Sequence, residues 1–369
     1  MTTPQQRLPA VDLLKALASQ FIVLHHLAAY GPLSEAVQEG MPDLIAWLYD
    51  NARMAVQVFL VVGGYLTARN FLPGGRPYGG HHLAAVANRY LRLTLPFLAA
   101  LAIVAVCAVF ARQALDDDFV PDAPTLAQTV AHLLLLQGVL DYEALTVGAW
   151  YVAIDIQLFV TMILLSRLAA AGEGLGASSR RAMLAMAGVL MAASLFWFNR
   201  DAALDDWAIY FFGAYGLGAA TCWVVQSRHA TRGLVLLAAL ALVALAVDFR
   251  GRLLVALAAA LVLGLAARSD RIGGLAAVPT THKLGAISYS LFLVHFPVLL
   301  LMNAAFVELD LAGPLAGAVG MGAAWGLSIL AAMVFHRWIE RPANRLRVGR
   351  PFARASRGPA AGFVQLQGR

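Results

Sequence analysis

The sequence predicts an all-α protein that crosses a membrane about ten times. Of its 369 residues, 60% are hydrophobic and only 13% are charged, and the mean hydropathy is +0.72. Soluble domains are typically about 45–50% apolar and about 25% charged. Apolar stretches such as 95–110 and 232–247 also recur along nearly the whole chain. These features together predict a polytopic transmembrane helix bundle.

The predicted spans follow from hydropathy and from the positions of Lys and Arg. A cytoplasmic N-terminus puts about 22 of the 27 basic residues in cytoplasmic segments, as the positive-inside rule requires. The acidic patches Asp116–Asp118 and Asp201–Asp206 then lie outside. The sequence therefore predicts that both termini are cytoplasmic. The spans are 13–30, 53–69, 93–111, 150–166, 182–198, 207–225, 233–248, 252–267, 284–302 and 314–335.

The apolar segment 126–140 does not fit this pattern. It is short, contains His132 and has acidic residues on both sides. If it spanned the membrane, Arg167 and Arg180 would face outward and every later loop would invert its charge bias. We therefore expect an outer-face amphipathic helix or a re-entrant helix, and the sequence leaves both arrangements open.

Residues 1–346 are expected to form one membrane-embedded domain, followed by a basic, disordered cytoplasmic tail over 347–369. Cys107 and Cys222 lie inside predicted spans and are interpreted as packing residues. The net charge of +6 suits an anionic leaflet or a phosphorylated ligand, and we expect no nucleic-acid partner. No metal site is expected, because His81-His82 lack a third ligand. The oligomeric state is not indicated.

A stripe of polar residues follows one face of the first span. At about 100° per residue, Lys15 and His26 lie within roughly 20° of each other, with Asp12, Ser19 and Tyr30 near the same face. Charged and polar groups inside a membrane helix are costly, so this stripe predicts a functional site. The alternative is that Lys15 extends to the headgroups and His26 bonds a neighbouring helix.

Six blocks in order resemble the acyltransferase 3 family of integral membrane acyltransferases. The spacing of Lys15 and His26 resembles the family's R/K-x10-H motif, and Arg89-Tyr90-Leu91-Arg92 resembles its RxxR loop. The other blocks are VQVFLVVGGYLT (56–67), AWYVAIDIQLF (149–159), LGAISYSLFLVHFPVL (284–299) and HRWIERPANRL (336–346). Three residues depart from the family pattern, since Gly63 and Tyr151 replace serines and Asp155 replaces a glutamate.

The resemblance implies transfer of an acyl group, often acetyl, from acyl-CoA to a hydroxyl of a cell-envelope or secreted carbohydrate. It implies a bacterial cytoplasmic (inner) membrane enzyme whose partners are acyl-CoA, a glycan acceptor and the lipid bilayer. Acyl-CoA is a co-substrate, and no tightly bound cofactor is expected. Two other classes stay open: a transporter or flippase of an acyl donor or glycan, and a structural membrane protein whose polar residues only join helices.

Residue roles follow from the resemblance together with the chemistry of each side chain. His26 is the expected general base, because neutral imidazole accepts a hydroxyl proton near neutral pH. Eleven residues of helix rise about 16 Å, so Lys15 should bind the phosphorylated end of the donor while His26 lies farther out. Asp155 is expected to orient His26, to bind the acceptor or to pair with an arginine. The expected donor-binding residues are Lys15, Asp12, Arg89 and Arg92, and the expected site-lining residues are Ser19, Tyr151, Tyr289 and His295.

Overall fold

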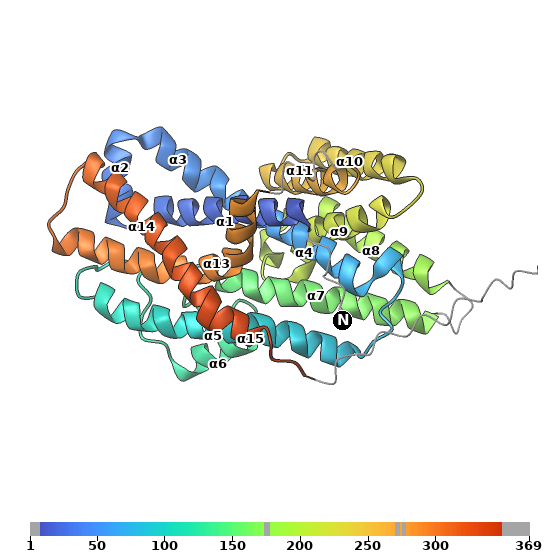
Figure 1. Ribbon diagram of the computed structural model, residues 1–369, viewed down its shortest axis with the longest axis horizontal. Coiled ribbons are helices and arrows are strands. Elements are labelled where there is room, and N and C mark those ends of the chain that lie inside the picture. The colour runs from blue at the N-terminus through green and yellow to red at the C-terminus, as the bar shows by residue number, and fades with distance from the viewer. Residues whose placement is uncertain (1–7, 173–177, 270–273, 275–277, 349–369) are drawn as a thin grey trace, which may run out of the picture.

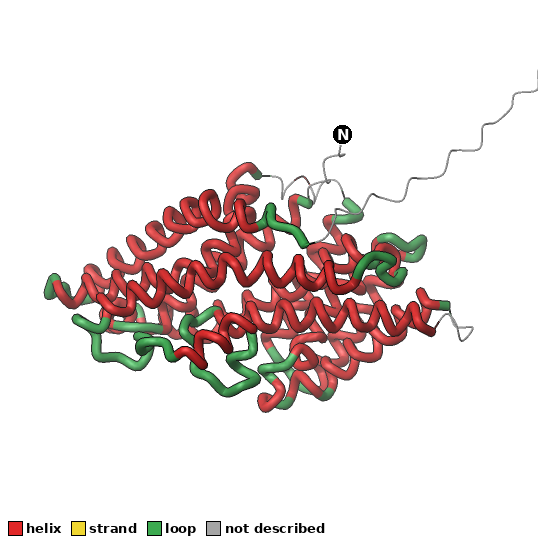
Figure 2. Tube along the Cα trace, turned by 90° about the horizontal axis from the view of Figure 1, so that it is seen from below, coloured by secondary structure: helices red, strands yellow, loops and turns green. Residues whose placement is uncertain are grey.

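The computed structural model describes residues 8–172, 178–269, 274 and 278–348, so the predicted tail lies outside the described residues from 349 onward. In these ranges the chain consists of helices and loops without a strand (Figures 1 and 2). Nine of the described helices are long and apolar enough to cross a membrane. A tenth apolar helix, α11 (Gly251–Ala266), has 16 residues and therefore extends about 24 Å. The predicted all-α polytopic bundle is confirmed.

All ten predicted spans correspond to helices in the structure. Proline opens α1, α2, α3, α13 and α14, where its missing N–H removes no intrahelical bond. The α-helices besides α11 are α1 (Pro9–Ala29), α2 (Pro32–Gly40), α3 (Pro42–Asn51), α4 (Val56–Phe71), α5 (His82–Ala111), α6 (Leu126–Leu134), α7 (Ala149–Ala171), α8 (Ser179–Phe196), α9 (Ala208–Val225), α10 (Ala230–Val247), α13 (Pro279–Glu308), α14 (Pro314–Phe335) and α15 (Arg341–Ala343). Short α2 and α3 precede α4 and were not expected.

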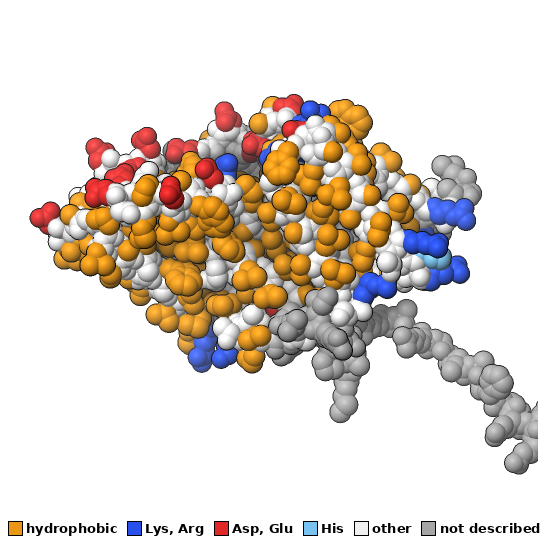
Figure 3. All heavy atoms as spheres, turned by 90° about the horizontal axis from the view of Figure 1, so that it is seen from above, with side chains coloured by type: hydrophobic (Ala, Val, Ile, Leu, Met, Phe, Trp, Pro, Cys, Tyr) orange, Lys and Arg blue, Asp and Glu red, His pale blue; other side chains and the backbone are white. Residues whose placement is uncertain are grey.

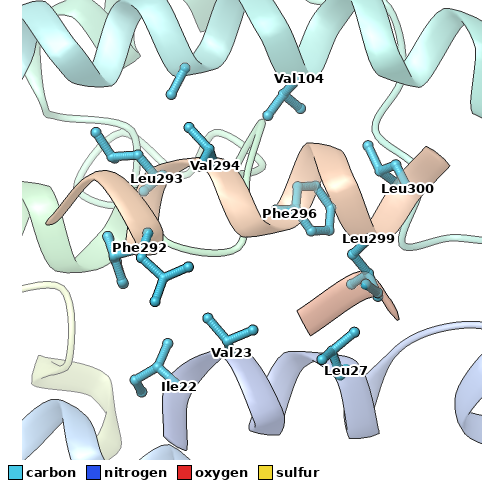
Figure 4. Close-up of a cluster of buried hydrophobic side chains, with 14 of the residues drawn as sticks. Ile22, Val23, Leu27, Val104, Phe292, Leu293, Val294, Phe296, Leu299 and Leu300 are labelled. Carbon is cyan, nitrogen blue, oxygen red and sulfur yellow. The ribbon is translucent and has the colours of Figure 1, made fainter. Parts of the chain in front are cut away.

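The helices form two packed groups that meet along α1, α4 and α7 (Figure 1). In one group α13 packs against α1, α5 and α14, and in the other α9 packs against α4, α8 and α11. Figure 4 shows the apolar interface of the first group, where Val23 and Leu27 of α1 point toward Phe296 and Leu299 of α13. This interface packs one side of the middle of α1 against α13 and thereby fixes the direction in which the polar stripe of α1 points.

Charge is divided between opposite sides of the molecule. Figure 3 shows most acidic side chains along the upper left edge, Lys and Arg side chains mainly at the right end and the lower edge, and a broad apolar surface between them. We call these two sides the acidic face and the basic face. Apolar surface between two polar faces is the pattern of a protein that lies in a bilayer.

Segment 126–140 does not cross the bundle. Its helix α6 has nine residues and extends only about 14 Å. The Tyr90 hydroxyl donates to the Leu133 carbonyl, and the buried His132 ring stacks on Phe97 with centroids 6.4 Å apart. Phe97 lies about 21 Å of helix before the end of α5 at Ala111. Of the two expected arrangements, these contacts favour the re-entrant one.

The α4–α9 contact depends on two glycines that let the backbones touch. A Cβ at Gly64 would lie 1.9 Å from the Tyr215 carbonyl oxygen, and one at Gly218 would lie 1.9 Å from the Val61 carbonyl oxygen. Small residues permit this approach in membrane helix pairs.

We expect Gly218→Ala to destabilise the fold by about 1–3 kcal/mol or more, because the helices must separate. Thermal unfolding of the purified protein in detergent measures this. Gly322→Ala is the matched control, since a Cβ there meets no atom within 4 Å. Equal melting temperatures for the two variants would contradict the proposed role of the α4–α9 contact.

Candidate active site

Two cavities lie along the polar stripe of α1, and Phe292 of α13 lines both of them. The histidine cavity, of about 520 Å³, is lined by His25, His26 and Tyr30 together with Asp118, Glu143 and Trp150. The lysine cavity, of about 130 Å³, is lined by Lys15, Arg89 and Arg92 together with Tyr151, Asp155, Tyr289 and Glu340. The charged lining residues of the first cavity, besides its histidines, are two carboxylates and Arg53, and those of the second are three cations and two carboxylates.

His26 forms a buried pair with His295. Its Nδ1 lies 2.8 Å from His295 Nε2, and the rings stack with centroids 4.9 Å apart. His295 Nδ1 lies 3.1 Å from the Leu291 carbonyl oxygen, which can only accept, so His295 Nδ1 carries the proton. In neutral His295 the Nε2 is then an acceptor, and His26 Nδ1 must donate to it.

This tautomer leaves His26 Nε2 unprotonated. Among the described residues no protein group bonds to this nitrogen, and it is not closed off from the histidine cavity. His26 therefore presents a proton acceptor to whatever occupies the cavity. The sequence suggested His295 as a lining residue; in the structure it lines neither of the two cavities and its Nε2 bonds His26 Nδ1.

The α1 stripe divides between the two cavities. Lys15 lines the lysine cavity and His26 the histidine cavity, as their separation along the helix predicts. Asp12 does not pair with Lys15 at ion-pair distance; its Oδ2 lies 2.8 Å from His282 Nδ1. Ser19 lines neither cavity and donates to the Ala16 carbonyl 2.9 Å away.

Asp155 pairs with Arg89 and does not contact His26. Arg89 Nη2 lies 2.7 Å and 2.5 Å from the two carboxylate oxygens of Asp155, and the carboxylate side chain is 6% exposed. The guanidinium also lies over the Phe159 ring, 5.6 Å from its centroid. Of the three roles expected for Asp155, the structure shows the pairing with an arginine. Arg92 lines the same cavity, and among the described residues it has no ion-pair partner.

The three departures from the family pattern gather in the lysine cavity. Gly63, Tyr151 and Asp155 all line it, and a Cβ at Gly63 would lie 3.7 Å from Asp155 Oδ1. The Tyr151 ring meets Phe292 edge to face, with centroids 5.3 Å apart. The Tyr289 hydroxyl donates to the Leu93 carbonyl at 2.7 Å. The Tyr151–Phe292 contact therefore lies where the two cavities approach each other.

Glu340, in the block HRWIERPANRL (336–346), lines the lysine cavity. Its side chain is buried, accepting from the Ser290 hydroxyl at 2.6 Å and lying 2.9 Å from His336 Nδ1. Residues 336–340 form a single π-helical turn. Such turns redirect side chains and are frequent at functional sites. The resemblance of HRWIERPANRL (336–346) to the family marked this position without indicating which way the carboxylate points.

The fold and these cavities define an integral membrane protein with a polar site divided between two cavities. The profile of a family described as an acyltransferase domain matches residues 8–335. The chain therefore belongs to the acyltransferase 3 family. It is also similar to the "Regulator of hypoxia-inducible factor 1" of Caenorhabditis elegans, with 28% identity over 104 residues, which is 25% of this chain and 21% of that protein. No solved structure matches the chain.

Proposed function

We propose that this membrane acyltransferase moves an acyl group, acetyl in the simplest case, from acyl-CoA to a hydroxyl of a cell-envelope or secreted carbohydrate. The observation that carries the proposal is the His26–His295 pair, which leaves His26 Nε2 as a proton acceptor in the histidine cavity. The proposed location is the bacterial cytoplasmic membrane, with the basic face toward the cytoplasm.

In the proposed reaction the acceptor hydroxyl attacks the thioester carbonyl while His26 Nε2 takes the hydroxyl proton. The tetrahedral intermediate then collapses, the carbon–sulfur bond breaks, and His26 returns the proton to the departing CoA thiolate. The products are an ester and free CoA. His295 supports both steps because its Nε2 accepts from His26 Nδ1 in the neutral and the protonated ring.

The donor phosphates are proposed to bind Lys15 and Arg92, the cations of the lysine cavity that form no ion pair with a carboxylate of the described residues. Arg89 was also an expected donor-binding residue, but its Nη2 is bonded to Asp155. Arg92 is exposed and thus accessible to a phosphate, and a guanidinium suits the bidentate geometry of that group.

We expect Arg92→Gln to weaken CoA binding about tenfold, since a charge-assisted hydrogen bond contributes about 1.5–3 kcal/mol. Titration calorimetry with CoA and the protein in nanodiscs measures the affinity. Dephosphorylated pantetheine should bind both proteins equally. Arg232→Gln, at an exposed position outside the cavity, is the control. An unchanged affinity of Arg92→Gln for CoA would remove this arginine from the donor site.

The assay that tests the function uses the purified protein in bilayers with labelled acetyl-CoA and extracted envelope glycans. Ester formation with release of the CoA thiol supports the transferase. Movement of label across the bilayer without an ester would instead support the transporter or flippase alternative. Analysis of envelope glycans from a deletion strain identifies the acceptor and the acyl group together, because the ester that disappears contains both.

A further inference from the structure

Trp150, the second residue of α7, lies where three cavities meet. It lines the histidine cavity, a neighbouring cavity of about 600 Å³ that contains Arg53, Arg250 and Arg252, and a smaller one of about 240 Å³ that contains Gln157. Other residues connect the same spaces, since Arg53 lines the first two. We call the three cavities together the Trp150 groove. The combined volume of these cavities is larger than the space that one acceptor hydroxyl and its acetyl group would occupy.

The indole of Trp150 is held in place and remains accessible. One contact is a stack on Phe211, with centroids 5.6 Å apart and planes at 29°, and another is the edge contact with Tyr151 at 6.1 Å. The residue is nevertheless 39% exposed, and among the described residues no group accepts a hydrogen bond from its indole N–H. A fixed aromatic ring binds a ligand at a small entropic cost. An apolar face with an adjacent free donor suits a sugar ring, which combines C–H faces with hydroxyls.

The charges of the groove favour a neutral ligand. Carboxylates outnumber arginines among the charged residues that line the groove. None of these carboxylates is in an ion pair within the described residues. They are Asp118, Asp141, Glu143, Asp205 and Asp206. Burial, together with Asp205 and Asp141, raises the pKa of Asp206. Carboxylates accept hydrogen bonds from sugar hydroxyls but repel anionic sugars.

The three arginines of the groove differ in how many of their side-chain nitrogens are already bonded. Arg250 donates to Asn199 Oδ1 at 2.7 Å and to the Leu195 carbonyl at 2.8 Å. Arg252 bonds the Tyr210 hydroxyl and the Asn199 carbonyl. Arg53 is exposed, and only its Nε has a protein partner among the described residues, so its terminal nitrogens remain available for hydroxyls.

We propose that the Trp150 groove binds a neutral oligosaccharide of several sugar units, with one ring stacked on Trp150 and the reacting unit at His26. The proposal rests on the transferase function proposed above and adds the length and charge of the acceptor. It makes Trp150 a binding residue for a unit next to the one that reacts.

The test measures binding directly, without acyl transfer. Protein in nanodiscs is titrated by calorimetry with neutral cello-, malto- and chito-oligosaccharides, from the monosaccharide to the hexasaccharide, and with oligogalacturonates as the anionic series. We expect affinity for at least one neutral series to rise with length and to exceed that for oligogalacturonates. Trp150→Ala should weaken the binding of the longer neutral chains about tenfold, and Trp150→Phe should retain most of it. Trp338→Ala, a highly exposed tryptophan outside the groove, should bind like the unmodified protein.

Three outcomes would overturn the proposal: no saccharide binding at millimolar concentration, tighter binding of the anionic series, or equal binding by Trp150→Ala. CoA affinity of the same variants shows that they are folded, because CoA is proposed to bind at the lysine cavity. Length-dependent saccharide binding without any acyl transfer would retain the groove and reject the transferase. Transfer to long neutral oligosaccharides that is unaffected by Trp150→Ala would retain the transferase and reject the groove.

Discussion

Replacing His26 with alanine is expected to lower the rate of acyl transfer by about 10²- to 10⁴-fold, the usual contribution of a general base. The variant removes the one ring nitrogen of the His26–His295 pair that has no hydrogen-bond partner among the described residues, His26 Nε2. Because CoA is proposed to bind at the lysine cavity, its affinity should not change. The rate is measured as labelled acetyl transferred to envelope glycans in membranes of a deletion strain that expresses each variant at equal level.

Two further histidine variants separate catalysis from packing. His295→Gln retains an oxygen that can accept from His26 Nδ1, but the amide does not orient the His26 ring as an imidazole does. We therefore expect a smaller loss of transfer rate than for His26→Ala, and a shifted pH–rate profile. His229→Ala, at an exposed position, is the control. Full transfer by a correctly inserted His26→Ala protein would reject the general base. A loss that only follows the amount of folded protein would favour a structural role for the pair.

Much of the fold was predictable because a membrane constrains the length and the apolar composition of each helix that crosses it. Apolar length and the placement of Lys and Arg were enough to locate all ten helices, including the short α11. Helical geometry also placed Lys15 and His26 at different depths, as the two cavities show. The entry of α6 into the bundle was not predictable, because it depends on tertiary contacts such as the one between His132 and Phe97.

The partners of the polar residues were less predictable, because each bond joins positions far apart in the chain. His26 and His295 are 269 positions apart, and Arg89 and Asp155 are 66 apart. The spacing of Asp12, Lys15 and His26 indicates that they share one face of α1, but it does not indicate which helix packs against that face. Asp12 illustrates this: helical spacing favoured Lys15 as its partner, whereas the packing of α13 against α1 brings His282 to it.

The arrangement separates the two chemical tasks of the proposed reaction. The cations proposed to bind the donor phosphates line the lysine cavity, and the proposed proton acceptor lies in a cavity lined by carboxylates and aromatic rings. Phe292 and Tyr151 lie between them, so the thioester must reach past these rings for the reacting carbonyl to meet His26. The same separation explains why variants on the two sides should have different effects, on donor affinity or on the rate of transfer.

The second large effect is expected at the buried Arg89–Asp155 pair. Arg89→Gln should destabilise the protein by about 3–5 kcal/mol, because it leaves the Asp155 carboxylate buried without its partner. Thermal or denaturant unfolding in detergent measures the loss. Arg89→Gln combined with Asp155→Asn should recover much of it, since the double variant contains no unpaired charge and its amides can bond each other. Arg92→Gln is the matched control, because Arg92 is exposed and has no ion-pair partner among the described residues.

The same variants distinguish a structural arginine from a phosphate ligand. If the bond to Asp155 is the main role of Arg89, the double variant should regain stability and bind CoA nearly as tightly as the unmodified protein. If Arg89 instead binds the donor phosphates, Arg89→Gln should melt normally and lose CoA affinity, and Asp155→Asn should not restore that affinity. The second result would return Arg89 to the donor site and would leave Asp155 available for the acceptor, the role that its bond to Arg89 now argues against.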